Sequence, residues 1–305
     1  MSVVESMVNF SERLKTMTVA VKLSQSRLGT KKGLTKDQIE QAADEFGADK
    51  KFLSASKKLL DTKHPKYQDV TSILNKARGY WESVTLDYPE DGIRLLRTEA
   101  VERFEAQMRE FKDDLQTAVT ALQEEYSELR SKARQDLGHL FREDDYPADI
   151  RDKFSLEFAY VAIEPARHLI DSFPELYERE RQRIQARFEE SLAIAEESFA
   201  VELQKTLAHA VDRLTDDSDG KRKKLCDSTV DNLRDFIQRF RNLDIGSNPE
   251  LGELIDTVEL ATRNVDVTVI KKSDDIRTII RDRLAEAQTK IDEMIVNMPR
   301  RKFDL

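Results

Sequence analysis

Carboxylates are concentrated between Leu140 and Pro165, in LFREDDYPADIRDKFSLEFAYVAIEP, which holds seven acidic side chains and two prolines. Such a density could bind a metal ion or supply a general acid and base. A calcium loop, however, needs the Asp-x-Asp-x-Asp-Gly register, and a di-iron helix needs Glu-x-x-His. Neither pattern occurs here. Asp149 instead stands where it can cap the residues that follow it, so we expect a solvated turn without catalytic or metal-binding residues.

Other residue types that carry chemistry are few and scattered. No histidine has another histidine or a cysteine three or four positions away, and zinc needs a cluster of His and Cys. The single cysteine, Cys226, excludes an internal disulfide and suits a reducing compartment. Beside Leu225 it is expected to be a partly buried structural thiol. Walker-type phosphate loops, dinucleotide loops and nucleophile elbows are absent from the sequence. We therefore expect no enzyme, no cofactor and no bound metal.

Lysine and arginine are the remaining candidates, as contacts for the phosphates of a nucleic acid. Residues 1–80 hold 15 basic against 9 acidic side chains, residues 81–220 hold 18 against 34, and residues 221–305 hold 17 against 16. A basic head joined to an acidic middle excludes nucleic acid along the whole chain, because phosphate binding needs a continuous basic track. The candidate contacts are Lys31, Lys32, Lys50, Lys51, Lys57 and Lys58, and, in a run more typical of a solvated linker, Lys221, Arg222, Lys223 and Lys224.

Long helices dominate the elements that must position these residues. Apolar residues recur at steps of three or four from Phe104 to Leu140 and again from Phe173 to Leu214. A helix of about 44 residues would be roughly 66 Å long, too long for a compact domain without a partner. Two such helices of matched length, joined by one irregular connection, favour an antiparallel, coiled-coil-like hairpin. Spacings of seven between apolar residues are mixed with spacings of eleven, and this mixture predicts nearly straight helices. Nearly straight helices favour a pair within one chain over an extended supercoiled dimer.

Shorter elements surround this hairpin. Alternating runs at 18–24, 84–88 and 155–163 predict three strands of a small sheet at its base. Thr35 and Gln38 have the spacing of a capping box, which predicts a helix from there. Two more helices are expected at 48–60 and 66–81, and Asn248-Pro249 predicts another helix start.

The fold class expected is therefore mainly α: a long antiparallel helical hairpin with a small β element at its base and a C-terminal helical segment. We divide the chain into a basic mixed α/β head (1–94), the hairpin (95–214) with a strand-bearing elbow (141–165), C-terminal helices (221–299) and a tail (300–305). No run of 18 apolar residues could span a membrane. The first residues lack the apolar core of a secretory signal, so a cytoplasmic protein is expected.

Several short motifs, in this order, resemble a known family. They are Gly-Ile-Arg-Leu-Leu (92–96), Ala-Arg-Gln-Asp-Leu-Gly (133–138), Asp-Tyr-Pro-Ala-Asp-Ile-Arg-Asp-Lys-Phe (145–154), the run 156–163, Val-Asp-Asn-Leu-Arg-Asp-Phe (230–236) and Asn-Pro-Glu-Leu-Gly-Glu-Leu (248–254). With them, most of the chain resembles the phage- and plasmid-borne domain of unknown function number 3150. Genes of that family tend to lie near MoxR-like or cobaltochelatase-like AAA+ ATPases. The resemblance implies a helical adaptor working with such an ATPase and supplies no catalytic residues.

The leading hypothesis is a non-enzymatic scaffold or adaptor in a phage- or mobile-element-encoded complex, with a protein partner and with room for a homo-oligomer. The alternative is a nucleic-acid-associated protein that binds phosphates through the basic N-terminal region. Salt separates the two, because phosphate binding weakens steeply with ionic strength, whereas binding through an apolar helix face survives moderate salt.

Overall fold

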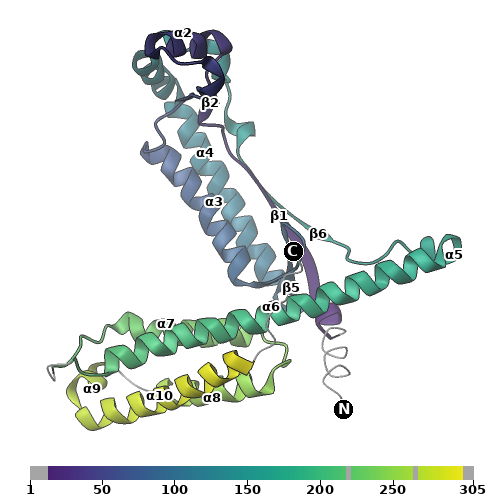
Figure 1. Cartoon of the computed structure of the whole chain (residues 1–305), viewed down its shortest axis with the longest axis vertical. Helices are drawn as coiled ribbons and strands as arrows, with labels where there is room; N and C mark the ends of the chain where they lie inside the picture. Colours follow the sequence, from purple (N-terminus) through teal and green to yellow (C-terminus); the bar gives the residue numbers. More distant parts are fainter. Residues whose placement is uncertain (1–12, 218–220, 264–266, 298–305) are drawn as a thin grey trace. The chain divides into compact units, whose positions relative to one another are not determined.

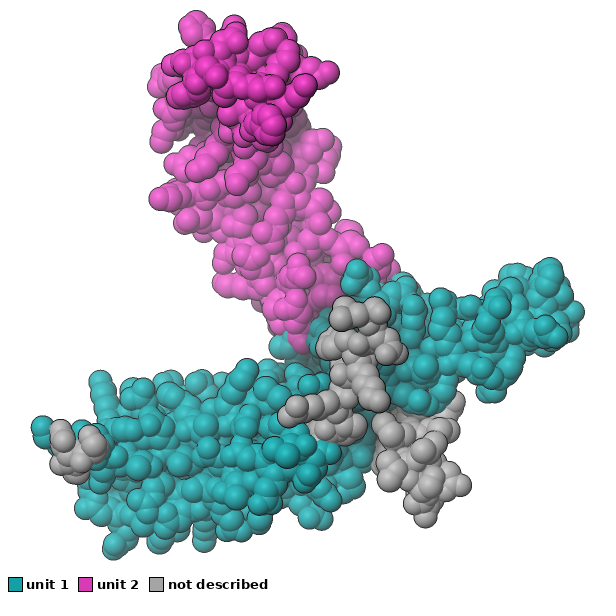
Figure 2. Space-filling view, in the orientation of Figure 1, with its two compact units in different colours: residues 1–21, 83–98, 161–305 teal, residues 22–82, 99–160 magenta. Residues whose placement is uncertain are grey.

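The chain forms two compact units in the computed structural model, which describes residues 13–217, 221–263 and 267–297. Unit 1 comprises residues 1–21, 83–98 and 161–305, and unit 2 comprises residues 22–82 and 99–160 (Figure 2). The described residues are mainly α-helical, as predicted. The expected segments are continuous, whereas both units are assembled from separate stretches of the chain. None of the described helices is long and apolar enough to cross a membrane.

Unit 1 is built around four helices. Its helices are α5 (Leu169–Ser172), α6 (Pro174–Leu214), α7 (Asp227–Leu243), α8 (Pro249–Thr262), α9 (Val267–Lys272) and α10 (Asp274–Asn297). Contacts join α6 to α7, α7 to α8, α8 to α10 and α10 to α6, and Figure 1 shows these four side by side. Apolar residues of α6 spaced three or four apart face this interior. One of them, Phe199, meets the ring of Phe240 edge-on at 5.1 Å. This arrangement is a four-helix bundle.

A buried arginine closes the carboxyl end of α6. Arg277 of α10 donates from its guanidinium to the backbone oxygens of Arg213 at 2.7 Å and Leu214 at 3.0 Å. The last carbonyls of a helix lack partners within the helix and carry partial negative charge, so a cation is favourable there. Burial lowers the pKa of Arg277. These bonds fix the end of α6 against the start of α10.

The two long helices have different packing partners. Helix α4 (Val101–Leu137) belongs to unit 2 and α6 belongs to unit 1. Helix α6 packs on α7 and α10, whereas α4 meets α3 (Pro65–Ser83) through Phe104, whose ring centre lies 6.1 Å from that of Tyr80. Both helices are close to the predicted length, but the predicted antiparallel hairpin between them is not confirmed.

Unit 2 combines α3 and α4 with shorter elements. These are α2 (Lys36–Phe46), β2 (Lys31–Gly33), β3 (Ser56–Lys58) and single 3-10 turns at Lys50–Phe52, Gly138–Leu140, Glu143–Asp145 and Arg151–Lys153. The helix predicted at 66–81 is confirmed as α3. The helix predicted at 48–60 is wrong, because a 3-10 turn and β3 occupy that stretch. The predicted capping box is present: the Thr35 hydroxyl accepts from the amide of Gln38, and the Gln38 side chain accepts from the amide of Thr35.

A four-stranded sheet has the order β4-β5-β1-β6. Its strands are β1 (Thr18–Ser26), β4 (Thr85–Asp87), β5 (Ile93–Arg97) and β6 (Ser155–Val161). All three predicted strands are present in it. The fourth, β5, lies where the sequence predicted the beginning of the long helix, and it pairs antiparallel with β4 so that Leu95 faces Leu86. The sheet is therefore larger than the small β element expected.

Candidate interaction surface

Four of the candidate lysines lie on one two-stranded sheet in unit 2. Strands β2 and β3 are antiparallel, with Lys31 opposite Lys58 and Lys32 opposite Lys57. Successive residues of a strand point to opposite faces, so Lys31 and Lys58 share one face, and Lys32 and Lys57 share the other. Like charges directly opposite each other destabilise a strand pair. Each face therefore needs an anion or water to separate its two ammonium groups.

Asp145 neutralises the face that carries Lys32 and Lys57. Its carboxylate oxygens lie 2.5 Å from Lys32 Nζ and 2.6 Å from Lys57 Nζ. The side chains of Asp145 and Lys57 are 1% and 3% exposed, whereas that of Lys32 is 55% exposed. Burial alone would raise the pKa of Asp145, but the two lysines outweigh it and the pKa is lowered. Lys57 also donates to the backbone oxygen of Leu140 at 2.5 Å. Lys57 is therefore an internal ion-pair partner.

The opposite face of this sheet leaves two cations in water. Lys31 and Lys58 are exposed, and among the described residues neither forms an ion pair. Lys50 is paired with Glu40 at 2.6 Å, whereas Lys51 is exposed and has no carboxylate within ion-pair distance in the described chain. Of the six predicted contacts in the N-terminal region, Lys31, Lys51 and Lys58 are thus the ones available to a phosphate.

The second basic run belongs to unit 1 and precedes α7, which begins at Asp227. Arg222 pairs with Asp274, and Lys223 Nζ lies 2.5 Å from Asp212. Lys221 and Lys224 are exposed. Two of the four charges are therefore used within the unit. Cys226, which follows this run, is an exposed free thiol, so the expected partial burial is wrong.

Several carboxylates of the acidic segment take part in ion pairs. Glu143 pairs with Arg130 and Arg134 of α4. Asp149 pairs with the guanidinium of Arg151 at 2.5 Å and accepts from the backbone amide of Arg151 at 2.9 Å, and these contacts lower the pKa of Asp149 to about 2. In the part of the chain that the structure describes, no group of three or more His, Cys, Asp or Glu side chains could hold a metal ion.

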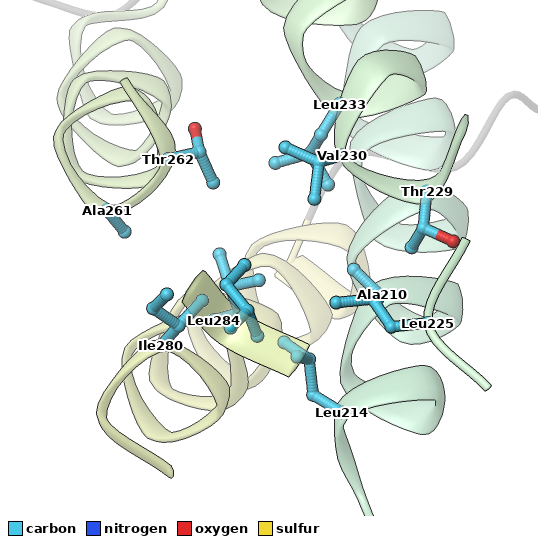
Figure 3. A pocket seen from close by; sticks show the side chains of 11 residues that line it. Ala210, Leu214, Leu225, Thr229, Val230, Leu233, Ala261, Thr262, Ile280 and Leu284 are labelled. Atoms are coloured by element: carbon cyan, nitrogen blue, oxygen red, sulfur yellow. The ribbon is translucent and has the colours of Figure 1, made fainter. Parts of the chain in front are cut away.

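An internal cavity of about 20 Å³ lies between α6, α7, α8, α9 and α10 of unit 1. It is lined by apolar side chains and by Thr229 and Thr262, whose hydroxyl oxygens point away from its centre (Figure 3). The Thr262 hydroxyl donates instead to the backbone oxygen of Val258 at 2.9 Å. A buried water needs two to four polar partners as well as space. The cavity is therefore a packing gap of the bundle and has no groups for catalysis.

Two phenylalanines of unit 2 are the most exposed aromatic residues in the part of the chain that the structure describes. Phe46, the last residue of α2, is 76% exposed, and Phe52, the last residue of the following 3-10 turn, is 89% exposed. We call these two residues the aromatic tip. Helix α2 and the 3-10 turn are in contact, and Gly47, with φ of 62°, reverses the chain between them. Leaving a Phe side chain in water forgoes about 2 kcal/mol of burial, and exposed aromatics are enriched at protein interfaces.

The aromatic tip was not among the residues selected from the sequence, although one signal could have found it. Within α2 the apolar residues before Phe46 are Ile39 and two alanines, and Ala43 is its single buried residue. A helix with so little apolar surface has too few neighbours to cover a terminal phenylalanine.

Comparisons with known proteins returned no relative. No family model, no curated protein and no solved structure matched the chain.

Proposed function

We propose that this chain is a non-enzymatic helical scaffold or adaptor that binds a protein partner through the aromatic tip. The observation that carries the proposal is the exposure of Phe46, on a helix whose single buried residue is Ala43, and of Phe52, on the 3-10 turn in contact with that helix. Three of the carboxylates that could have served as catalytic groups, Glu143, Asp145 and Asp149, take part in ion pairs instead. The family resemblance adds a MoxR-like AAA+ ATPase of a phage or mobile element as the partner class.

An aromatic tip is suited to this task because a few buried aromatic side chains supply most of the binding energy of an interface. Covering Phe46 and Phe52 would contribute about 2 kcal/mol each. Lys51, next to Phe52, is exposed and would lie at the rim of the contact. Such an interface depends mainly on apolar burial and therefore withstands moderate salt.

The test is capture of partners by the tagged chain from nuclease-treated extract of its host, at low and moderate salt, followed by mass spectrometry. The double variant Phe46→Ser/Phe52→Ser removes the aromatic tip. Leu260→Ser is the matched control, because Leu260 is 70% exposed and lies on α8 of unit 1. Trp81 is buried in unit 2 and is the one tryptophan of the sequence, so its fluorescence shows whether each variant keeps that unit folded.

We expect the wild type and Leu260→Ser to retain an AAA+ ATPase at moderate salt and the double variant to lose it. An identical set of captured proteins for all three chains would contradict the role of the aromatic tip. Capture of nucleic acid alone, released by nuclease or salt, would contradict the adaptor function itself.

A nucleic-acid-binding function is the second candidate, and the pairing of Lys31 with Lys58 favours it. These two exposed lysines lie opposite each other without a carboxylate among the described residues, so a phosphate would relieve their repulsion. Fluorescence anisotropy with a labelled single-stranded oligonucleotide tests this function. Binding should weaken steeply with salt, and Lys31→Glu/Lys58→Glu should weaken it further and flatten the salt dependence. Equal binding by the variant would exclude this face.

A further inference from the structure

The carboxyl-terminal end of α2, which carries the aromatic tip, has charges of the sign that its own helix disfavours. Asp44 and Glu45 lie in the last turn of α2, directly before Phe46, and that turn holds no basic residue. The carboxyl end of a helix carries partial negative charge, so carboxylates there destabilise the helix and cations stabilise it. Both side chains are exposed, and neither forms an ion pair in the described part of the chain. The helix alone therefore gives no reason for these two residues.

The backbone at this end of α2 adds further acceptors. The amides of Gly47 and Ala48 bond to oxygens of earlier residues of the helix. The backbone oxygens of Glu45 and Phe46 accept no hydrogen bond from any described residue. The last carbonyls of a helix lack partners within it and are satisfied by water, by side chains or by a ligand. The end of α2 therefore presents carboxylates and free carbonyls together, beside an exposed aromatic ring.

The cations near this end do not neutralise it. Lys50 bonds to Glu40 at 2.6 Å, and Lys51 belongs to the 3-10 turn that follows. Residues 37–49 hold five carboxylates and no basic side chain. The surface around Phe46 is therefore anionic, which fits a cationic group of a partner and would repel an acidic one.

We propose that the aromatic tip recognises an arginine of its protein partner, bound across the last turn of α2. A guanidinium has several donors in one plane, which can bond to a carboxylate and to free carbonyls at the same time. Its flat face also stacks on aromatic rings, and the Phe46 side chain is 76% exposed. Lysine carries a compact ammonium group, which offers neither the planar fork nor the stacking face. This inference rests on the proposed binding of a protein partner through the aromatic tip, and it names the group that the partner presents.

The arrangement separates binding from folding. If Asp44 and Glu45 serve a partner at the expense of the helix, Asp44→Lys/Glu45→Lys should abolish binding and stabilise α2. We expect the amide hydrogens of α2 to exchange about tenfold more slowly in this variant, because its charges then suit the end of the helix. A purely structural role of the two carboxylates predicts the opposite, which is faster exchange.

Capture of partners from nuclease-treated host extract, followed by mass spectrometry, tests the proposal. The chains compared are the wild type, Phe46→Ser/Phe52→Ser, Asp44→Lys/Glu45→Lys and Glu124→Lys/Glu128→Lys. The last variant is the charge-matched control, because Glu124 and Glu128 are exposed residues of α4 in the same unit and form no ion pair among the described residues. A partner of the aromatic tip is a protein that the wild type captures and the double phenylalanine variant does not. The charge reversal on α2 should lose that protein as well, and the control should retain it.

Binding of the purified partner gives the size of the effect. The charge reversal on α2 should weaken the Kd at least about thirtyfold, because it places like charges side by side, and the control should change it less than about twofold. Replacement of the contacting arginine of the partner by glutamate should weaken binding to the wild type. The same replacement should restore binding to Asp44→Lys/Glu45→Lys, as a direct contact requires.

The possible results distinguish this inference from the proposed function. A partner that depends on Phe46 and Phe52 but is retained by Asp44→Lys/Glu45→Lys would overturn the inference and leave the function of the aromatic tip intact. Loss of the partner together with faster amide exchange in α2 would also overturn the inference, because unfolding of the helix would then explain the loss. The absence of any protein that depends on the two phenylalanines would overturn both.

Discussion

Replacing Asp145 by asparagine tests whether a buried ion pair holds the β2–β3 sheet within unit 2. The substitution keeps the shape of the side chain and leaves the Lys57 ammonium group, 3% exposed, without its carboxylate. Removing one partner of a buried pair costs about 3 to 5 kcal/mol. Lys57 retains the backbone oxygen of Leu140 as an acceptor, so we expect the free energy of unfolding of unit 2 to fall by about 2 to 4 kcal/mol.

Trp81 fluorescence during urea unfolding measures this loss, because the single tryptophan of the sequence is buried in α3 of unit 2. With a slope of about 2 kcal/mol per molar urea, the midpoint should fall by about 1 to 2 M. Lys32→Met removes the exposed partner of the same carboxylate and should cost about 0 to 1 kcal/mol. Asp149→Asn, which removes the carboxylate of an exposed ion pair in the same segment, should lower the midpoint much less than Asp145→Asn does, because exposed ion pairs contribute little.

The pH dependence supplies an independent check. The pKa of Asp145 is lowered in the folded state, so its stabilisation is present above the unfolded pKa of about 3.9 and is lost as pH falls through the lower folded pKa. The midpoints of the wild type and Asp145→Asn should therefore converge in acid. If Asp145→Asn shifts the midpoint at neutral pH by no more than Asp149→Asn does, the reasoning is refuted.

Three further predictions concern unit 1. Trp81 lies in unit 2, so we assign to the unfolding of unit 1 the part of the far-UV circular dichroism change in urea that Trp81 fluorescence does not follow. Arg277→Met leaves the carbonyls at the end of α6 without donors and should lower the free energy of unfolding by about 2 to 3 kcal/mol; an unchanged midpoint would contradict this. The Ser191 hydroxyl is buried and has no hydrogen-bond partner among the described groups, so Ser191→Ala should raise the free energy of unfolding by about 1 kcal/mol. A lower free energy of unfolding would contradict this, because it would show that the hydroxyl makes a stabilising hydrogen bond. Burial and the nearby Asp244 raise the pKa of Glu196, so its ionisation costs stability as pH rises through that pKa. Glu196→Gln should therefore raise the midpoint at neutral pH and have no effect below the ordinary pKa of about 4.3.

Elements whose signals are short-range could be predicted from the sequence. Thr35 and Gln38 form the expected capping box, and Asn248 caps α8 by accepting from the amide of Leu251. These bonds join residues three positions apart, so the local sequence specifies them. Strand β5 was missed because only a 3-10 turn (Thr98–Ala100) separates it from α4, and its strand character depends on pairing with β4.

The candidate lysines also show that local sequence does not specify contacts between distant segments. The sequence indicates where cations are concentrated, but it does not show that Asp145, more than 80 positions away from Lys57, lies between two of them. Burial of one lysine and exposure of its cross-strand neighbour depend on contacts between segments that are distant in sequence. Choosing candidate phosphate contacts by local charge density alone therefore selected exposed lysines together with Lys57, which belongs to an internal ion pair.

An apolar periodicity shows that a helix has an apolar face, and it does not show what covers that face. Elements of unit 2 cover the apolar face of α4, and the bundle of unit 1 covers that of α6. The matched sequence patterns had predicted that the two helices pack against each other. On α6 this chain buries the apolar face from Ile184 onward, whereas no residue from Pro174 to Arg183 is buried. Phe46 likewise extends the apolar side of α2 past its single buried residue. Binding surfaces of such a helical protein are therefore best sought where an apolar pattern continues beyond the neighbours that its own fold provides.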